Sequence, residues 1–313
     1  MTRRGPKGGN GGPSRGGGKA RTGGTGGRGT PSRGGGVQRQ RPPRSAGGGG
    51  RQGSRQQDRG LGGRQVEGRQ AVRELLIAER RTVHDVWVAA ELEGDPGVAD
   101  IVEIAAARRI PVSYVGRGKL DREARTDAPQ GVLAHAGQLP EADLADLVRP
   151  ADGSPPFLVA LDGVTDPGNL GAIIRNCDGA GVTGILLPRH RAAHVTPTVT
   201  KASAGAVEYA RIALVPGLPT AIGQLREHRV WVVGLDDAAD RSIHDLADLA
   251  VDPICLVLGA EGAGLSRLVR SRCDVLASIP MRGGVSSLNV SAAAAVAAYE
   301  ITRGRQSPSI HSS

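Results

Sequence analysis

Four short apolar runs in the second half of the chain constrain its fold more than any other feature. Between them lie stretches in which apolar residues recur at helical spacing. A run that is apolar at every position suits a strand buried on both faces, as in a parallel sheet covered by helices. We therefore predict an α/β fold built on a parallel sheet. The expected strands are 157–161, 184–187, 230–233 and 254–258.

A smaller α/β domain is expected in front of this sheet. Ala71, Val72, Leu75 and Leu76 form the apolar stripe of one helix, and a second helix is expected around Ile101. Short apolar runs between these helices are typical of strands. The predicted strands are 86–88, 111–115 and 132–134, and the predicted divisions are a first domain over 66–137, a linker over 138–156 with a short helix at 141–148, and a larger domain over 157–305.

Residues 1–65 have a composition unlike the rest of the chain. They contain 24 of the 48 glycines and 15 of the 40 Lys and Arg residues, with Asp58 as their only acid. Their net charge of +14, against +9 for the whole chain, leaves the other 248 residues at −5. Almost no apolar side chain is present to offset the entropy of ordering, so we predict a disordered tail, and likewise disorder over 306–313. A flexible polycation suits RNA phosphates, and a solubilising extension is the alternative.

Several classes of protein are disfavoured by what the sequence lacks. No stretch reaches the roughly 18 apolar residues that span a bilayer, so a cytoplasmic protein without membrane contact is expected. The three cysteines form no C-x-x-C pair, and His190 and His194 have no further ligand nearby, so neither a disulfide nor a metal site is predicted. The phosphate-binding fingerprints of dehydrogenases and NTPases are also missing.

Polar motifs follow three strands, and the first is at residues 162–175. Asp166 can cap a helix that has Pro167 in its first turn. Gly168, Gly171 and Arg175 are expected on a face away from the buried stripe, where the glycines leave room for a bulky group beside the guanidinium. An ordinary surface or salt-bridged arginine is the simpler interpretation.

The second motif, residues 258–266, runs from a strand directly into a glycine-rich loop. Glu261 within this loop would repel a phosphate, so a cofactor without phosphate fits better. A solvated loop acid is the alternative.

The third motif, residues 279–291, joins a glycine bend to a helix. Ser286, Ser287 and Asn289 stand where this helix begins. N-capping is the simpler interpretation, but three polar groups and a glycine bend exceed what a cap requires and favour a small-molecule site. Because ligands bind past the carboxyl ends of parallel strands, the three loops are expected to meet. We expect the buried face of the helix to comprise Leu288, Ala292, Ala295, Val296 and Tyr299.

These motifs carry a resemblance to a known family. They read DGVTDPGNLGAIIR, LGAEGAGLS and IPMRGGVSSLNVS, followed by Tyr299 and Glu300. These sequences are similar to the signature motifs of the SpoU/TrmH ribose 2′-O-methyltransferases. They are most similar to those of the RlmB type, which methylates a guanosine of 23S rRNA. The resemblance covers about residues 66–305 and excludes the tail.

The resemblance implies a fold, a cofactor and an assembly. The C-terminal segment would form a trefoil knot, an exception to the unknotted rule. S-adenosylmethionine would bind in the knot against Gly259, Ile279 and Leu288. The family works as a homodimer, and the first domain would be an RNA-binding module like ribosomal protein L30.

The resemblance also implies catalytic roles in a metal-free, in-line methyl transfer. Arg175 would reach the nucleotide phosphate and the 2′-oxygen. A guanidinium with a pKa above about 12 is a poor base, so orientation and oxyanion stabilisation are favoured. Asn169 and Glu261 would hold Arg175 and the substrate, and Ser287 and Asn289 would complete a polar wall.

Two alternatives remain open at this point. The motifs do not separate rRNA from tRNA as substrate, although the first domain favours rRNA. A non-catalytic RNA-binding or ribosome-assembly factor would be expected to have lost some motif residues, and all five catalytic candidates are present.

Overall fold

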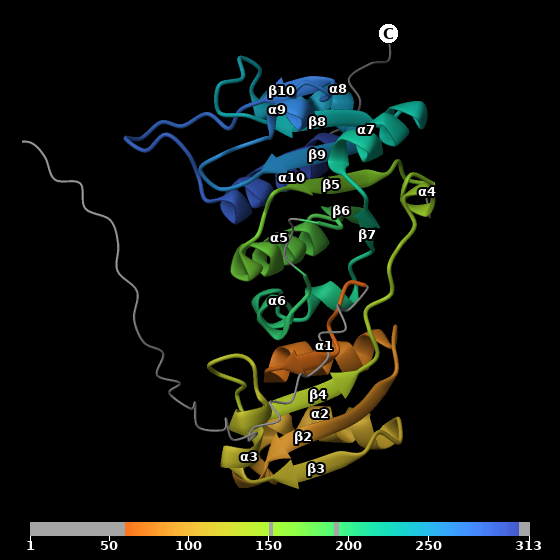
Figure 1. Ribbon diagram of the computed structural model, residues 1–313, viewed down its shortest axis with the longest axis vertical. Helices are drawn as coiled ribbons and strands as arrows, with labels where there is room; N and C mark the ends of the chain where they lie inside the picture. Colours follow the sequence, from red (N-terminus) through yellow and green to blue (C-terminus); the bar gives the residue numbers. More distant parts are fainter. Residues whose placement is uncertain (1–59, 150–152, 191–193, 307–313) are drawn as a thin grey trace, which may run out of the picture. The chain divides into compact units, whose positions relative to one another are not determined.

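The computed structural model describes residues 60–149, 153–190 and 194–306, which form two sheets with their helices (Figure 1). Most of the two segments predicted to be disordered lies outside these residues. The described chain nevertheless begins before the expected boundary at Val66. Leu61 is buried, and the Gly63 amide donates to the Val195 carbonyl at 2.9 Å. Residues 60–65 therefore pack as part of the fold.

The first sheet has four strands in the order β1-β4-β2-β3, of which only β2 and β3 run parallel. Helices α1 and α2 cover one face, and α1 buries the four residues that the sequence predicted. Helix α3 packs on the other face through Leu120. The bounds are β1 Gln65–Glu67, α1 Arg69–Ala78, β2 Val83–Ala89, α2 Pro96–Ala107, β3 Val112–Val115, α3 Arg117–Glu123 and β4 Val132–Ala136.

The second sheet has six strands, all parallel, in the order β10-β8-β9-β5-β6-β7. The four predicted strands are confirmed as its centre. The two that were not predicted are short strands at the sheet edges. The bounds are β5 Phe157–Asp162, β6 Gly184–Pro188, β7 Ile212–Val215, β8 Trp231–Leu235, β9 Ile254–Gly259 and β10 Val275–Ala277.

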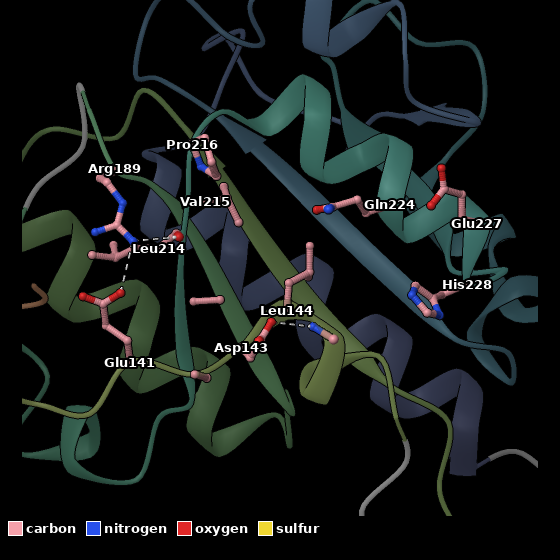
Figure 2. A pocket seen from close by; sticks show the side chains of 13 residues that line it. Glu141, Asp143, Leu144, Arg189, Leu214, Val215, Pro216, Gln224, Glu227 and His228 are labelled. Atoms are coloured by element: carbon pink, nitrogen blue, oxygen red, sulfur yellow. Dashed lines mark hydrogen bonds and ion pairs between the residues drawn. The ribbon is translucent and has the colours of Figure 1, made fainter.

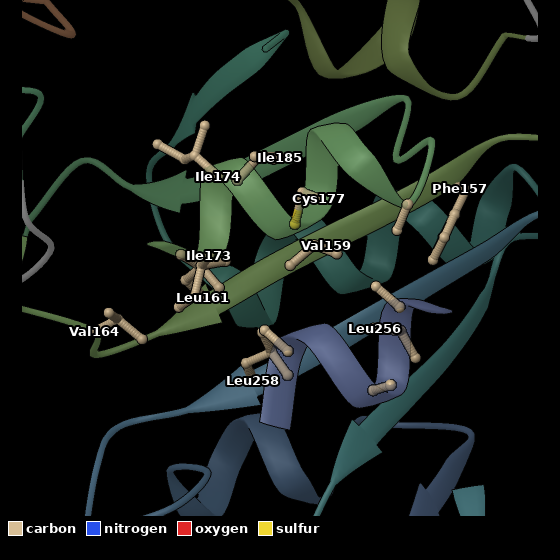
Figure 3. Packing of buried hydrophobic residues seen from close by; sticks show 14 of the residues in the cluster. Phe157, Val159, Leu161, Val164, Ile173, Ile174, Cys177, Ile185, Leu256 and Leu258 are labelled. Carbon is tan, nitrogen blue, oxygen red and sulfur yellow. The ribbon is translucent and has the colours of Figure 1, made fainter. Parts of the chain in front are cut away.

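Helices cover both faces of this sheet, which explains why its central strands are apolar at every position. Phe157, Val159 and Leu161 point to one core with Ile173 of α5 (Figure 3). Leu158 and Ala160 point to the opposite core. The first face is covered by α5 (Pro167–Gly179), α6 (Pro197–Ala202), α8 (Ala247–Ala250) and α10 (Val290–Gln306), and the second by α4 (Leu144–Leu147), α7 (Leu218–Glu227) and α9 (Arg267–Arg270).

The buried face of α10 is not the one that the sequence predicted. Leu288, Val296 and Tyr299 are 38%, 38% and 52% exposed. The prediction was wrong because it followed the larger side chains, whereas α10 approaches α5 and α8 through its small ones. The buried residues of α10 are Val290, Ala294, Ala297, Ala298, Ile301 and Gly304.

The segment predicted as a linker packs against the second sheet. The Ala142 amide donates to the Ile212 carbonyl at 2.8 Å. Leu147 is buried, and α4 is shorter than the predicted helix 141–148. This segment therefore lies along the edge of the second sheet.

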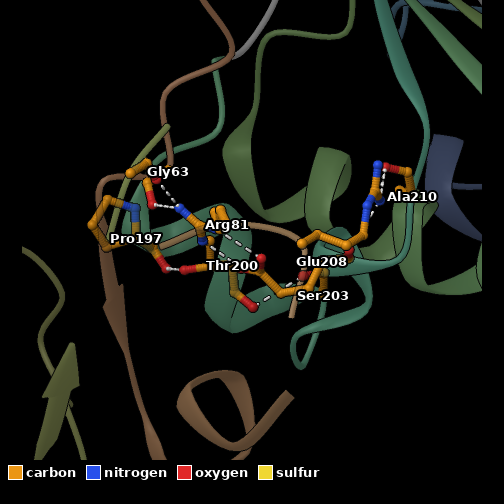
Figure 4. A network of polar contacts seen from close by, with 9 residues as sticks. Gly63, Arg81, Pro197, Thr200, Ser203, Glu208 and Ala210 are labelled. Atoms are coloured by element: carbon orange, nitrogen blue, oxygen red, sulfur yellow. Dashed lines mark hydrogen bonds and ion pairs between the residues drawn. The ribbon is translucent and has the colours of Figure 1, made fainter. Parts of the chain in front are cut away.

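A buried ion pair joins the part of the chain around the first sheet to the part around the second (Figure 4). The Arg81 guanidinium donates to both Glu208 oxygens, from Nε at 2.9 Å and from Nη2 at 2.5 Å. The two side chains are only 3% and 1% exposed. Arg81 Nη1 also donates to the carbonyls of Gly63 and Gly137, the latter at 2.7 Å. The turn between α1 and β2 is thus bonded directly to the segment after α6.

Candidate cofactor and catalytic site

The three motif loops converge at the carboxyl edge of the second sheet, as predicted. The second and third motifs line a cleft of about 400 Å³, and the first motif joins them through hydrogen bonds of Asn169. Gly259, Glu261, Ile279, Ser287 and Leu288, five of the eight predicted site residues, line it. The cleft walls combine backbone of the glycine-rich loop with apolar side chains and a few polar groups, as is usual for small-molecule sites.

A chain of hydrogen bonds joins the motifs beside this cleft. The Asn169 Nδ2 atom donates to Glu261 Oε2 at 3.1 Å, and Asn289 Nδ2 donates to Asn169 Oδ1 at 3.0 Å. Asp166 caps α5 by accepting from the Asn169 amide at 2.7 Å. The side chains of Asn169, Glu261 and Asn289, one from each motif, are therefore held in fixed orientations.

Asn289 also performs the capping role that was considered for the serines. Its Oδ1 atom accepts from the Ser291 amide at 2.8 Å and from Ser291 Oγ at 2.6 Å. Ser286 and Ser287 line the cleft, and neither forms a hydrogen bond within the part of the chain that the structure describes. Their hydroxyls are left for a ligand.

Close backbone packing explains the glycine-rich loop. A Cβ atom on Gly259 would lie 2.1 Å from the carbonyl carbon of Gly264. Ala260 and Gly264 exchange backbone hydrogen bonds of 3.0 and 2.8 Å, which close a tight loop. The loop thereby presents its backbone to the cleft.

The loop of the third motif is held at both of its ends. On the strand side, the Ser278 amide donates to the Arg241 carbonyl at 2.8 Å. On the helix side, Asn176 Nδ2 of α5 donates to the Ser291 carbonyl at 2.9 Å. Between these anchors, residues 282–289 are exposed.

Arg175 does not join the other predicted catalytic residues. It is exposed on α5 and does not line the cleft, and its side chain forms no ion pair or hydrogen bond with other described residues. The expected contact with Asn169 or Glu261 is therefore not formed. Gly171, expected to leave room beside Arg175, is buried instead, and a Cβ atom there would lie 2.5 Å from Ala202 Cβ of α6. This glycine permits helix packing.

Three charged residues in the cleft wall, Asp236, Asp237 and Arg270, were not predicted from the sequence. Asp236 and Arg270 form an ion pair through Asp236 Oδ2 and Arg270 Nε. A hydrogen bond from Arg270, together with one from the Ala238 amide, lowers the pKa of Asp236 although burial opposes this shift. Asp236 directly follows β8, so the same strand-end argument applied to the motifs could have found it.

A second hollow, of about 480 Å³, lies away from the motifs (Figure 2). Glu141 and Arg189 form an ion pair of 3.3 Å at one side, and Glu227 and His228 lie at the other. None of the predicted site residues lines this hollow, so we assign the site to the motif cleft.

The described residues hold no group of three or more His, Cys, Asp or Glu side chains arranged to bind a metal. Among the same residues, no helix has the length and hydropathy needed to cross a membrane.

These features define an α/β protein with two sheets. Its second sheet is all parallel and has a cleft at its carboxyl edge. The SpoU rRNA methylase family matches residues 156–299, and the RNA 2′-O ribose methyltransferase substrate-binding family matches residues 65–142. The chain belongs to the SpoU/TrmH family of RNA methyltransferases.

Similar proteins span nearly the whole described chain. The 23S rRNA (guanosine-2′-O-)-methyltransferase RlmB of Pseudomonas aeruginosa is 42% identical over 244 residues, covering 77% of this chain and 96% of the relative. YacO of Bacillus subtilis, named to the TrmH family of tRNA/rRNA methyltransferases, is 38% identical over 243 residues, covering 77% and 95%. The SpoU methyltransferase AviRb from Streptomyces viridochromogenes, solved with S-adenosylmethionine, superposes with a TM-score of 0.65 at 28% identity, covering 77% and 89%.

Proposed function

We propose that this protein transfers the methyl group of S-adenosylmethionine to the ribose 2′-oxygen of a guanosine in 23S rRNA. The observation that carries this proposal is the Glu261–Asn169–Asn289 hydrogen-bond chain beside the cleft. It occurs in a chain 42% identical to an enzyme with that activity.

The cleft suits this cofactor. Ile279 and Leu288 offer apolar contact to an adenosine, and the backbone of the loop after Gly259 offers hydrogen bonds. Glu261 beside the cleft disfavours a phosphate-bearing cofactor and tolerates a sulfonium cation. When bound, S-adenosylmethionine supplies an activated methyl group whose leaving group is a neutral thioether.

The chain's own residues would hold and polarise the nucleotide. Glu261, oriented by Asn169, keeps acceptor sites for the ribose hydroxyl, and Ser287 can donate or accept beside it. The Arg175 guanidinium, which has no side-chain partner among the described residues, is available to bind the nucleotide phosphate and stabilise negative charge at the 2′-oxygen. Alignment of the oxygen with the methyl group is the main contribution expected of these groups.

We further propose a homodimer formed through the exposed apolar face of α10. Val296 and Tyr299 are exposed on this face, and Leu288 and Val285, the latter 67% exposed, lie in the loop directly before α10. A contiguous group of exposed apolar side chains is typical of a surface that binds a partner. Because Leu288 also lines the cleft, the interface would border the cofactor.

The knot and the RNA-binding role of the first domain belong to the same proposal. Support for the knot is that β10 lies at one sheet edge while α10 packs against α5 and α8 across β9. The match of the first domain to a substrate-binding family supports its contact with RNA. Action on ribosomal RNA would place the protein in the cytoplasm.

The test is methyl transfer from labelled S-adenosylmethionine to unmodified 23S rRNA and, separately, to tRNA. Arg175→Ala should abolish transfer while cofactor affinity is retained. Arg229→Ala is the matched control, because Arg229 precedes β8 and so lies at the opposite edge of the sheet from the motifs. Transfer confined to tRNA would correct the substrate, and cofactor binding without transfer to either RNA would favour an assembly factor.

A further inference from the structure

Asp236 is built into the cofactor cleft from a strand that carries none of the three motifs. It follows β8, and its amide donates to the Ala277 carbonyl of β10 at 3.0 Å. Its side chain is 12% exposed and lines the cleft together with Gly259 and Ile279. The backbone position of this carboxylate is therefore fixed by the sheet.

The carboxylate orientation is fixed as well. Oδ1 accepts from the Ala238 amide at 2.9 Å, and Oδ2 accepts from Arg270 Nε. A carboxylate oxygen can accept two hydrogen bonds, so each oxygen retains one acceptor site. The neighbouring Asp237 is exposed and has no comparable anchor among the described residues. Asp236 is thus the preorganised acceptor of the pair.

The cofactor offers two kinds of donor to such an acceptor, the ribose diol and the methionyl ammonium. The Arg270 guanidinium neutralises the charge of Asp236 at short range, which weakens the attraction for a cation. Two acceptor sites on one carboxylate suit two adjacent hydroxyls. An acid beyond a strand end binds a ribose hydroxyl in the same way in dinucleotide-binding α/β folds.

We propose that Asp236, held by Arg270, binds the ribose hydroxyls of S-adenosylmethionine. This proposal rests on the cofactor assigned under the proposed function. It adds two residues outside the motifs to the cofactor site, Asp236 as a direct ligand and Arg270 as a positioning residue.

The test is calorimetric titration with two probes, S-adenosylhomocysteine and 5′-methylthioadenosine, of which the second has the ribose but lacks the amino-acid end. Asp236→Asn should weaken both about ten- to a hundredfold, because a hydrogen bond to a charged group is lost. Asp240→Asn removes a nearby exposed acid that does not line the cleft and should change neither affinity.

The titration has four possible outcomes. Equal weakening of both probes supports the proposal, whereas unchanged affinity, or weakening of S-adenosylhomocysteine alone, overturns it. Failure of the wild type to bind either probe would instead overturn the proposed function. If Asp236→Asn lowers the midpoint of thermal unfolding, the titration is repeated with the variant Arg270→Gln. This variant keeps the hydrogen bond from the Ala238 amide to Asp236. It should weaken both probes by a smaller factor, and unchanged affinity would again count against the proposal.

Discussion

Asn169 and Glu261 are 92 positions apart in the chain, yet a 3.1 Å hydrogen bond from Nδ2 to Oε2 joins them beside the cleft. Asn289 extends the contact from a third segment. The side-chain amide of Asn169 therefore acts as a two-sided connector, donating to one motif and accepting from another.

Replacing this connector should impair catalysis more than cofactor binding. Asn169→Ala removes a hydrogen bond to a carboxylate, for which about 1.5–3 kcal/mol is typical, or roughly ten- to a hundredfold in kcat. Asn169→Asp should be at least as harmful, because it places a second carboxylate against Glu261. Steady-state kinetics with saturating cofactor would measure the effect, and an unchanged kcat would show that the hydrogen bond is incidental.

Breaking the Arg81–Glu208 pair should destabilise the protein strongly. Arg81→Met leaves Glu208 buried without its partner, which typically costs about 3–5 kcal/mol. The double variant Arg81→Met/Glu208→Leu should recover part of that loss, since no charge is then left alone. Urea unfolding of the single and double variants would test this, and a double variant less stable than the single would refute it.

Gly259 should not tolerate a side chain. In Gly259→Ala the new methyl group would overlap the Gly264 backbone, so the loop must open and cofactor affinity should fall by about tenfold or more. Gly223→Ala in α7 is the control, because a Cβ atom there meets nothing within 4 Å and alanine favours the helix. Cofactor titration of both variants would compare them.

The buried thiols predict a pH dependence. Burial, together with the charge of Asp178, raises the pKa of Cys177 to about 12, and burial also raises the pKa of Cys255. A raised pKa means that the folded state holds these protons more tightly than the unfolded state. The contribution of these protonated thiols to the free energy of unfolding is thus fully present below the ordinary thiol pKa of 9.0. It is lost as the pH rises from there toward 12.

Two measurements check this expectation. The unfolding midpoint should decline between pH 9 and pH 11, in addition to any general alkaline effect. Cys177→Ser and Cys255→Ser variants should show a shallower decline, and an equal slope would contradict the assignment. Native Cys177 and Cys255 should also resist alkylation near pH 8, because the thiolate is the reactive form.

The basic tail, residues 1–65, should account for much of the salt dependence of RNA binding. A deletion for this test should end at residue 59, because Leu61 is buried in the fold. Each phosphate contact contributes about 0.7–0.9 to the slope of log affinity against log salt, so the truncated protein should give a flatter line. Equal slopes for the two proteins would show that the tail does not hold RNA.

The sequence predicted best those features that depend on burial at every position. The central strands of the second sheet were found because residues such as Leu158 and Val159 are buried on opposite faces. The buried face of α10 was mispredicted because alanine contributes little to a hydrophobic pattern, although its small side chain permits close packing between helices. Close packing also explains Gly171, whose neighbour Ala202 lies 31 positions further on and leaves no local signal.

The candidate site was predictable as a meeting of three loops, since the carboxyl ends of parallel strands share one edge. The side-chain contacts within it were not. Whether Asn169 bonds to Glu261 or to Arg175 depends on a few ångströms of loop placement, and Asp236 was overlooked because it has no motif around it.

The anchoring of the third-motif loop has a consequence for how the cofactor enters. Ser278 is tied to Arg241 before the loop, and Ser291 is tied to Asn176 after it. The entropy lost when a ligand orders this loop is therefore limited to the loop's internal freedom, because the positions of its two ends are set when the protein folds. We expect cofactor exchange to require motion of this loop alone, while the sheet beneath it keeps its structure.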